Sequence, residues 1–367
     1  DTSVTGVQTC ALPISLGVSA GLAGALFGKV AMAQEAKKGG TMRLGMYGGE
    51  STNSLDPAIA ASQVPYQVNM TWGEMLVDTT PDGGLDMRLA EEVSSTPDAM
   101  EWKFKIRSGV EFHNGQTLTA DDVVATLKRH TDEQSQSGAL GIVQGIAEMK
   151  AEGDMVTLTL KEANADLPFL MTDYHLMIQP GGGVDNPTAG IGAGPYVIEV
   201  NEPGVRHTFK KFANYFDSSI GHVDEIEMLV INDNTARTAA LQSGQVHIMN
   251  RVDPKVAELL AGVPGVTISS VPGRGHYVFI MHCDKAPFDN NDMRMALKLA
   301  INRQEMVEKI LGGLGSIGND FPINAAYPLF DASIPQRTFD PAMAAEHYKK
   351  SGHDGSPIVL RVAPGAF

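Results

Sequence analysis

The clearest pattern of hydrophobic and polar positions lies in residues 101–112. Apolar Trp102, Phe104 and Ile106 alternate with basic Lys103, Lys105 and Arg107. This two-residue period is typical of a β-strand with one buried face. Val110 and Phe112 continue the pattern, and residues 113–115 then read His-Asn-Gly. Because Asn and Gly tolerate positive φ angles, we expect a turn there.

A helix is predicted after this turn. Thr119 suits the N-cap, because its hydroxyl can accept a hydrogen bond from the backbone N–H of Asp122 at the third helical position. The carboxylates of residues 121–122 also favour the positive end of a helix. Val123 and Leu127 belong to the apolar stripe of this helix. Strand, turn and capped helix together predict an α/β module.

The rest of the chain alternates between strand-like and helix-like stretches. Strand patterns cover residues 41–46, 155–161, 208–214, 225–231, 246–248, 276–282 and 358–362. Helix patterns cover residues 63–75, 235–243 and 291–301 and the stretches that begin at 253, 302 and 340. The stretch at 276–282 is apolar enough for a buried strand. Residues 180–194 are rich in Gly, Pro and Asn, and we expect a boundary loop there.

Local start and stop signals support these helices. Asn234 and Asn302 are expected N-caps, and residues 253–254 and 340–341 are Asp-Pro pairs, which place Pro at the first helical position. Gly244 is expected to end the helix before it, because glycine adopts positive φ without strain. Strands and helices mixed in this order predict an α/β protein.

The first 33 residues have a composition of their own. The letters VTGVQTCALPI look like a translated sequencing adapter, which makes about residues 1–15, with Cys10, an assembly artefact. Residues 16–30 resemble the apolar core of an export signal, and residues 31–33 read Ala-Met-Ala, an A-x-A cleavage pattern. The weak hydrophobicity of this core is more typical of the twin-arginine route than of the general secretory route. We expect a mature, soluble periplasmic protein that begins near Gln34.

Length, charge and cysteine content narrow the class of protein. A chain of 367 residues suggests about two domains and can bury a sizeable core. The formal net charge is −15, and no basic stripe exists that could follow phosphates, so we expect no nucleic-acid partner. After the leader, Cys283 is the single cysteine, which excludes an intrachain disulfide. We expect Cys283 to be a small buried side chain.

Four motifs occur in an order that resembles one known family. Residues 85–129 hold the basic strand, the FHNG turn and the TADD-capped helix. Residues 192–196 read GAGPY, and residues 223–226 (VDEI) are followed by AALQSGQV at 239–246. Residues 289–303 form the helix pattern DNNDMRMALKLAINR. Together they resemble the signature of the family 5 solute-binding proteins, the peptide, nickel and opine receptors of bacterial ABC importers, over roughly residues 40–325.

The resemblance implies a fold and a domain arrangement. The fold would be α/β and like the type II periplasmic binding proteins, of the large cluster C type, with two lobes and an inserted subdomain. Residues 34–75 and 190–280 would form lobe I, residues 76–189 the subdomain, and residues 281–367 part of lobe II. In the family, lobe II runs well past this point. We therefore expect a chain that is truncated at both ends and has an incomplete second lobe.

A ligand site between the two lobes is the site that the resemblance implies, since clefts between domains are the usual place for small ligands. From lobe I, we expect Asn53, Ser54 and Leu55 to bond a polar ligand through backbone and hydroxyl groups. Tyr66 and Trp72 would supply flat apolar walls. For Trp72, a place in the core is an equally good interpretation.

Further ligand contacts are expected where the chain crosses between lobes. Arg274 could hold a carboxylate through two parallel hydrogen bonds, and His276 and Tyr277 could stack or hydrogen-bond. An ordinary surface ion pair for Arg274 and a core position for Tyr277 are the alternatives. Asn319 and Phe321 would line the second-lobe side.

Two motifs suggest enzymes but lack the necessary context. Residues 313–318 satisfy G-x-G-x-x-G, yet a dinucleotide site needs a strand before it and a helix after it, and here a capped helix precedes it. Ser316 has Leu314 where a serine-hydrolase elbow has Gly. Side chains at 282–284 (His-Cys-Asp) would point to opposite faces of a strand and cannot meet one ion. We therefore predict no enzyme activity, no cofactor and no metal.

The sequence thus predicts a monomeric substrate-binding subunit of a bacterial ABC importer. It would capture a small solute, most simply a short peptide, favour the closed state by contacts with both lobes, and deliver the solute to the permease transmembrane subunits. Nickel-chelate, opine, sugar and haem ligands are the alternatives within the family. The alternative from another class is a hydrolase or a cofactor-dependent enzyme that uses residues 313–318.

Overall fold

The computed structural model describes residues 37–80, 83–132, 136–270, 275–325, 327 and 330–361. The chain divides into two compact units, and the division falls between Met249 and Asn250. We call residues 37–249 the N-terminal unit and residues 250–361 the C-terminal unit. Throughout these described residues, every helix is too short or too polar to span a membrane.

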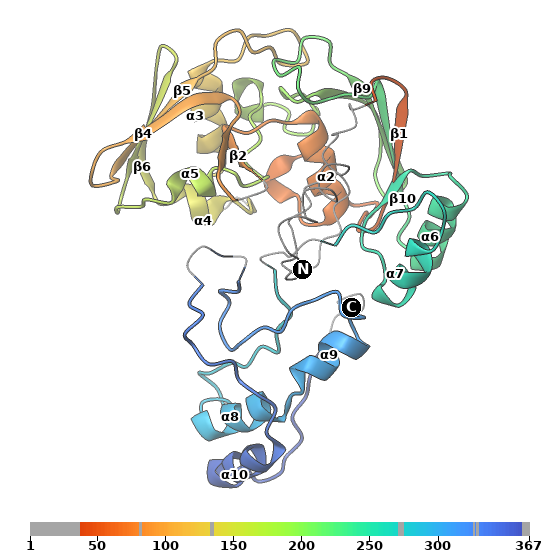
Figure 1. Ribbon diagram of the computed structural model, residues 1–367. Coiled ribbons are helices and arrows are strands. Elements are labelled where there is room, and N and C mark those ends of the chain that lie inside the picture. Colours follow the sequence, from red (N-terminus) through yellow and green to blue (C-terminus); the bar gives the residue numbers. More distant parts are fainter. Residues whose placement is uncertain are drawn as a thin grey trace, which may run out of the picture. The chain divides into compact units, whose positions relative to one another are not determined.

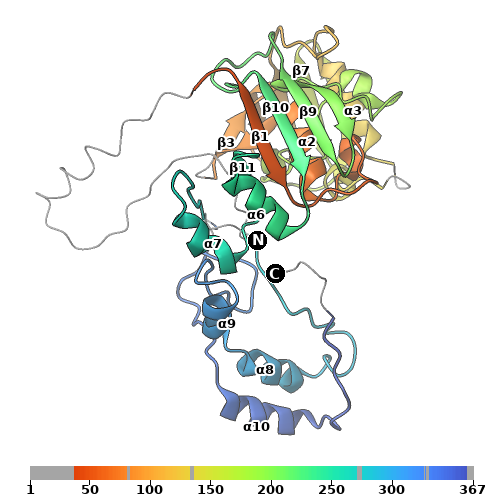
Figure 2. The ribbon, with the colours of Figure 1, turned by 90° about the vertical axis from the view of Figure 1, so that its right-hand side faces the viewer.

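A five-stranded sheet forms the frame of the N-terminal unit (Figure 2). Its strands lie in the order β11 (Ile248–Met249), β1 (Thr41–Met46), β10 (Glu225–Val230), β9 (Arg206–Lys211) and β8 (Tyr196–Glu202). β1 runs parallel to both neighbours, whereas β10, β9 and β8 pair in antiparallel fashion. Strands from the start of the chain and from residues 196–249 therefore share one sheet, and residues 47–195 are inserted between them.

Two helices pack on this sheet. α2 (Gln63–Trp72) contacts β8 and β9, and its Val68 and Trp72 join a core with Phe209 and Met228. α6 (Asn234–Gln242) contacts β1 and β11. Its N-cap is Asp233, whose carboxylate accepts from the N–H of Ala236 at 2.7 Å, so the predicted cap at residue 234 is one residue too late. A carboxylate caps as well as an amide does, so the sequence alone did not decide between them.

A second sheet lies within the inserted residues (Figure 1). It is antiparallel, with the order β4 (Ala90–Ser95), β5 (Glu101–Ile106), β7 (Met155–Leu160) and β6 (Ile146–Glu152). α3 (Ala120–Arg129) packs against β6 and β7. The predicted alternation in β5 is confirmed, because Phe104 and Ile106 are buried whereas Lys103 is exposed. The smaller elements of this region are β2 (Val77–Thr79), β3 (Leu85–Met87), η1 (Pro57–Ile59), α4 (Leu140–Val143), α5 (Leu167–Leu170) and η2 (Pro180–Gly183).

The cap of α3 also anchors a glycine-rich loop. The predicted bond is present, with Thr119 Oγ1 accepting from the N–H of Asp122 at 3.3 Å, and Asp122 Oδ2 accepts from the N–H of Thr119 at 2.9 Å. Asp122 Oδ1 accepts from the N–H of Gly181 at 2.8 Å, which holds η2 against the helix. Gly182 has φ 73°, and a Cβ there would stand 2.5 Å from the carbonyl carbon of Ala125. Only glycine fits this approach of two backbones.

The described part of the C-terminal unit consists of helices and connecting segments. The helices are α7 (Pro254–Ala261), α8 (Asn291–Ala300), α9 (Arg303–Lys309) and α10 (Pro341–Ser351). α8 and α10 lie side by side (Figure 1), and His347 Nδ1 is 2.6 Å from Asp292 Oδ1. The predicted start of α9 is confirmed, because the Asn302 side chain accepts from the N–H of Glu305 at 3.1 Å. The two predicted Asp-Pro starts are confirmed as well.

Two strands predicted for this region are wrong for the described residues. Residues 276–282 and 358–361 form no strand, and Ile280 and Val359 are 77% and 75% exposed. The prediction of a buried Cys283 is also wrong, because its side chain is exposed. The two strand errors have one physical reason. In the described part of the chain, no strand pairs with either segment, so neither segment is enclosed in a sheet.

The α/β class predicted from the sequence is confirmed. The four-stranded sheet lies within residues 76–189, where the inserted subdomain is predicted. The compact units divide near residue 249, whereas the predicted lobe boundary lies at residue 280. The individual domain boundaries stay predictions.

Candidate ligand-binding site

Asn53, Ser54 and Leu55 lie in the loop that follows β1. The polar side chains serve the loop itself: Asn53 Oδ1 accepts from the N–H of Glu50 at 2.6 Å, and Ser54 Oγ accepts from the N–H of Asp56 at 3.0 Å. Leu55 is buried in the core beneath them. The acceptor oxygens of both side chains therefore shape the loop, whereas the Asn53 amide N–H groups and the Ser54 hydroxyl can still donate.

The same three residues line a cavity of about 10 Å³. The cavity is closed by Val64, Pro65, Val68, Asn201 and His207. His207 Nδ1 lies 2.8 Å from Asn201 Oδ1, and burial lowers the pKa of His207 to about 4, so the ring is neutral at pH 7. A space of this size accommodates about one water molecule. It is too small for a solute.

The segment from residue 56 to residue 60 is clamped at three points. Arg129 Nη1 donates to Asp56 Oδ1 at 2.9 Å, and the N–H of Gly138 donates to the carbonyl of Ala58 at 2.9 Å. His175 Nε2 lies 2.9 Å from the carbonyl oxygen of Ala60. These contacts join the loop to α3 and to the chain near residue 175. They fix the position at which α2 begins.

Tyr66 is an accessible member of the predicted site. The residue is 38% exposed, and its ring meets the ring of Tyr174 edge to face, with centroids 4.7 Å apart. Tyr174 in turn lies over His175 at 4.1 Å, and His175 Nδ1 is 2.6 Å from Asp173 Oδ1. Sequence reasoning missed Tyr174 and Asp173, which lie more than a hundred positions from Tyr66 in the chain. A single sequence does not indicate that Tyr66 and Tyr174 lie next to each other in the folded chain.

Trp72 does not form a ligand wall in this structure. Its side chain is fully buried, and the carbonyl oxygen of Trp72 accepts from the N–H of Gly194 at 3.0 Å. A Cβ on Gly192 or Gly194 would lie within 3 Å of Trp72. The glycines of the GAGPY turn thus let the turn press against Trp72. Burial of Trp72 fits the core alternative, and its predicted ligand contact stays a prediction.

The predicted residues of the C-terminal unit are not gathered in one place by a described contact. Arg274 lies outside the described residues. His276 and Tyr277 are exposed, and Asn319 Nδ2 donates to the carbonyl of Pro335 at 3.0 Å. Phe321 is half-buried. Their ligand contacts stay predictions.

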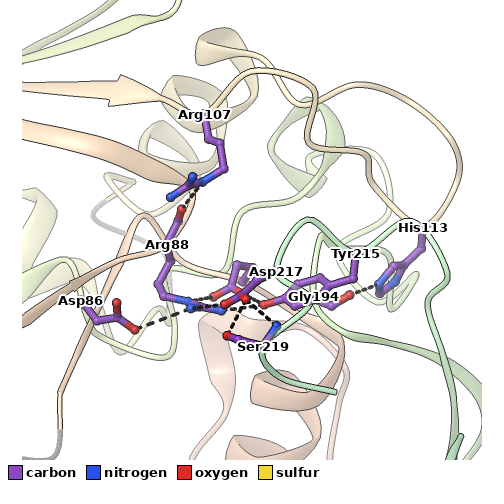
Figure 3. A network of polar contacts seen from close by, with 9 residues as sticks. Asp86, Arg88, Arg107, His113, Gly194, Tyr215, Asp217 and Ser219 are labelled. Carbon is purple, nitrogen blue, oxygen red and sulfur yellow. Dashed lines mark hydrogen bonds and ion pairs between the residues drawn. The ribbon is translucent and has the colours of Figure 1, made fainter. Parts of the chain in front are cut away.

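Arg88 is the centre of a dense polar network in the N-terminal unit (Figure 3). Its guanidinium donates to Glu74 Oε2 at 3.1 Å, to Asp217 Oδ2 at 3.2 Å and to the Tyr215 hydroxyl at 2.6 Å. The Tyr215 hydroxyl donates to Glu74 Oε2 at 2.6 Å. Arg107 Nε donates to the carbonyl of Arg88 at 3.1 Å. The network therefore joins the segment between α2 and β2, the β3–β4 connection and the segment near residue 215.

The guanidinium of Arg88 pairs with three carboxylates, those of Glu74, Asp86 and Asp217. Burial alone would lower the pKa of Arg88, but Glu74, Tyr215 and Asp217 together outweigh burial and raise that pKa, so the guanidinium stays charged. Burial raises the pKa of Glu74 against the opposing effect of Arg88. Since all three carboxylates engage Arg88 within the protein, the network fits a scaffold and not a ligand site.

The FHNG turn is bonded to the GAGPY turn. His113 Nε2 lies 2.9 Å from the carbonyl oxygen of Gly194 (Figure 3). The N–H of His113 donates to the carbonyl of Gly192 at 2.9 Å. Burial lowers the pKa of His113, so the ring is neutral and Nε2 is the donor. Two of the motifs that carried the resemblance thus hold each other in place.

A hollow of about 220 Å³ opens beside these turns. It is lined by Asn114, Gln116, Gln179, Pro180, Gly181, Gly183, Asp185, Asn186, Ala189 and Ile191. Its polar groups are mostly side-chain amides, which hydrogen-bond without selecting charge. Sequence reasoning missed it, although the glycine run at 181–183 was a visible sign of unusual backbone there.

The described residues offer little for catalysis or metal binding. His130 Nδ1 lies 2.6 Å from Ser137 Oγ, but both residues are buried, so no substrate reaches this pair. Within the described ranges, no three His, Cys, Asp or Glu side chains are placed to share a metal ion. Residues 313–318 follow helix α9, and none of the described residues 319–339 begins a helix. A dinucleotide site does not fit that order.

The comparisons with known proteins all point to one family of solute-binding proteins. The family described as bacterial extracellular solute-binding proteins, family 5 Middle, matches residues 85–364. The glutathione-binding protein GsiB of Salmonella typhi is 28% identical over 320 residues, which are 85% of this chain and 62% of that protein. GsiB of Shigella flexneri serotype 5b is 25% identical over 317 residues, 83% of this chain and 60% of that protein. The chain therefore spans less than two thirds of these curated relatives.

Solved structures confirm the predicted periplasmic-binding-protein fold. The PBP AgaA from A. tumefacien R10, in complex with agropinic acid, has a TM-score of 0.73 and 26% identity, over 85% of this chain and 64% of AgaA. The periplasmic binding protein DppA from Helicobacter pylori, in complex with the peptide STSA, has a TM-score of 0.74 and 19% identity, over 86% of this chain and 67% of DppA. Because the family match extends over residues 85–364, the chain belongs to family 5 of the bacterial extracellular solute-binding proteins.

Proposed function

We propose that the whole protein is the substrate-binding subunit of a bacterial ABC importer and that it carries a short peptide or a peptide-like solute. The observation that carries this proposal is the family match over residues 85–364. Curated relatives named as glutathione-binding proteins support a peptide-like solute, since glutathione is a tripeptide.

The proposed mechanism is capture without chemistry. A solute that contacts two lobes favours the closed state, because its differential affinity for that state shifts an equilibrium between open and closed forms. The closed complex then docks on the transmembrane subunits of the permease. The N-terminal unit suits such a role, because its strongest charges are bonded within the protein and form a stable support.

A second candidate is an opine-like solute. AgaA, whose structure holds agropinic acid, shares 26% identity with this chain. Peptides and opines both carry carboxylates and amide or amine groups, so one site chemistry could suit either. Nickel chelates, sugars and haem are the further alternatives within the family.

A melting experiment on the full-length protein separates these candidates. Glutathione, trialanine, agropinic acid and a nickel–histidine complex are added in turn, and the shift in melting temperature is measured. A ligand at a hundred times its Kd should stabilise the folded protein by about 2.7 kcal/mol. Mass spectrometry of the solute before and after incubation is the control for chemistry. No shift with any solute, or consumption of one, would count against a transport receptor.

Localisation and partners belong to the same proposal. We propose a periplasmic monomer that docks on a permease, exported by the twin-arginine route. Deletion of the twin-arginine translocase should keep the precursor in the cytoplasm. Normal export in that strain would remove this route and leave the receptor function intact.

A further inference from the structure

The hollow between the FHNG turn and the glycine run at 181–183 lies within the N-terminal unit and measures about 220 Å³. Pockets that hold drug-sized ligands measure about 300 to 1,000 Å³, so this one suits a smaller molecule. It shares no lining residue with the cavity beside Asn53, Ser54 and Leu55. A ligand in the hollow would therefore occupy a place separate from the loop that the sequence predicts to bind the solute.

Both walls of the hollow are fixed by bonds to neighbouring parts of the unit. On one wall, Asp122 Oδ1 accepts from the N–H of Gly181 at 2.8 Å. The other wall follows His113, whose N–H donates to the carbonyl of Gly192 at 2.9 Å. Walls that are fixed in advance lose little entropy when a ligand binds.

Gln179 contributes a buried polar group to the hollow. The residue is 1% exposed, and its Nε2 donates to the carbonyl of Pro187 at 3.1 Å. Its Oε1 is buried and has no hydrogen-bond partner among the described residues. A Cβ on Gly183 would stand 2.5 Å from this oxygen, so glycine is the residue that fits beside it. Because an unpaired buried acceptor is costly and rare, a ligand that donates a hydrogen bond would stabilise this part of the hollow.

The rim of the hollow offers unused donors. Gln116 Oε1 accepts from Asn114 Nδ2 at 2.5 Å. Asn186 Oδ1 accepts from the Thr188 hydroxyl at 3.0 Å. The two side-chain oxygens are thus engaged, whereas the amide N–H groups of Gln116 and Asn186 have no acceptor among the described residues. These N–H groups can donate to a ligand.

The rim also offers an unused acceptor. Asp185 is exposed, and its carboxylate makes no hydrogen bond or ion pair with another described residue. The remaining wall is less polar, with Pro180, Ala189 and Ile191 among the lining residues. The hollow therefore combines amide donors, one carboxylate and a small apolar wall.

This combination suits hydroxyl groups on a ring. Each hydroxyl both donates and accepts, so neighbouring hydroxyls can donate to the carboxylate of Asp185 and accept from the amide of Gln116. The apolar wall can meet the C–H groups of the ring. An anionic ligand suits the hollow less, because Asp185 would repel it. A single exposed carboxylate also gives little preference for a cation.

We infer that this hollow is a second ligand site, which binds one ring of a neutral sugar. The inference goes beyond the proposed function, because this ligand contacts the inserted residues of the N-terminal unit and needs no contact from the C-terminal unit. A free monosaccharide and the end ring of an oligosaccharide present the same hydroxyl groups. The shared chemistry is a neutral ring with adjacent hydroxyls.

Sugar titrations of the full-length protein, followed by NMR, test the inference. The methyl glycosides of glucose, galactose and mannose are added in turn, and 2-methoxytetrahydropyran, the same ring without its other hydroxyls, is the control. At least one glycoside should shift the side-chain amide signals of Gln116 and Asn186 and saturate in the millimolar range, and the control should not. Saturation by none of the three, or equal shifts with the control, would overturn the site and leave the proposed transport function standing.

Charge and length sharpen the assignment. The uronic acid of the sugar that binds carries a carboxylate and should bind at least about fivefold more weakly, because Asp185 repels it. Equal or tighter binding of the uronic acid would overturn the assignment to a neutral sugar. A trisaccharide that ends in the same ring distinguishes the two sources. Binding as tight as that of the glycoside indicates the end of a glycan, and loss of binding indicates a free sugar; both results support the site.

Variants connect the binding to these residues. Asp185→Asn should weaken the glycoside about tenfold, because hydrogen bonds to a charged acceptor are among the stronger ones. Gln116→Ala should weaken it about threefold, since one neutral hydrogen bond is lost. Asp154→Asn makes the same change at an exposed position outside the hollow and should leave the affinity unchanged.

These substitutions leave the fold intact, because Asp185 and Gln116 are both exposed, and the urea midpoint of tryptophan fluorescence checks this. An unchanged affinity in Asp185→Asn would place the sugar elsewhere on the protein and overturn the inference. An equal loss in Asp154→Asn would do the same, because the effect would then not depend on the hollow.

Discussion

The two units of this chain handle charge and apolar surface in opposite ways. The N-terminal unit buries Glu74 and Arg88 as a bonded pair, and its sheets carry continuous apolar cores. The C-terminal unit exposes Ile280 and Val359 on segments that have no strand partner among the residues that the structure describes. Local signals are equally good in both, since both contain capped helices. The comparison teaches that caps determine where a helix begins, while strand partners determine whether apolar segments become buried.

The comparison between the two units assumes that the buried Glu74–Arg88 pair contributes to the stability of the N-terminal unit, and a substitution of Glu74 tests this. Glu74→Ala should cost about 1.5 to 3 kcal/mol, because Arg88 loses its most buried carboxylate partner and keeps Asp86 and Asp217. Both tryptophans, Trp72 and Trp102, lie in this unit, so tryptophan fluorescence in urea reports its unfolding alone. Glu202→Gln, which removes an exposed pair with Arg206, is the control and should leave the midpoint unchanged. Equal midpoints for both variants would contradict the prediction.

Acid should destabilise the N-terminal unit through its buried histidines. Burial lowers the pKa values of His130 and His207 to about 4, below the value near 6.5 of an unfolded chain. The unfolded state therefore binds protons first, and stability falls as pH drops from about 6.5 to 4, by about 3 kcal/mol for each ring. Urea midpoints followed by tryptophan fluorescence across this range measure the loss. His207→Gln should remove about half of the pH dependence of the urea midpoint. An unchanged pH dependence would contradict the role of His207.

Matched caps compare the two units directly. Thr119→Ala removes the capping hydroxyl of α3, whose apolar face is buried, and should lower the stability of the N-terminal unit by about 1 kcal/mol. Asn302→Ala removes the corresponding cap of α9, a helix without buried residues. It should leave the tryptophan midpoint unchanged and raise amide exchange only near residues 303–309. A shared loss of midpoint would show that the units unfold together.

The smallest effect is expected on the exposed apolar segment. Ile280→Lys should change the tryptophan midpoint by less than about 0.5 kcal/mol, since a surface substitution touches no packed group. It should also reduce concentration-dependent association, measured by sedimentation, because exposed apolar surface promotes contact between molecules. A large loss of stability would mean that Ile280 is covered in solution, and would erase the difference between the units.

Much of the fold could be predicted because its signals are local. The alternation at 101–106, the cap at Thr119 and the Asp-Pro helix starts depend on residues within a few positions of one another. The strand predicted at 276–282 is wrong, because an apolar run does not reveal whether another strand lies beside it. Among the described residues, no strand pairs with this segment. β4 and β6 were missed, since polar and charged residues on their open face hide the alternation.

The candidate site was harder to predict, because its members meet only in space. Tyr66 could be named as an aromatic side chain near the start of a helix, but Tyr174 reaches it only through the folding of the insertion. Trp72 looked like a ligand wall because a large flat ring suits that role, and the glycines that press on it are far away in sequence. The presence of an aromatic residue in the sequence does not show whether its ring will pack against the protein or against a ligand.

Gly182 has a consequence for how this protein can vary over evolution. Any side chain there would meet the backbone of α3, whereas position 181 has open space around its Cβ and a φ of 57° that asparagine also tolerates. Natural relatives should therefore keep glycine at 182 and vary more freely at 181. This difference should hold whichever solute each relative transports, since it follows from one close approach of two stretches of main chain.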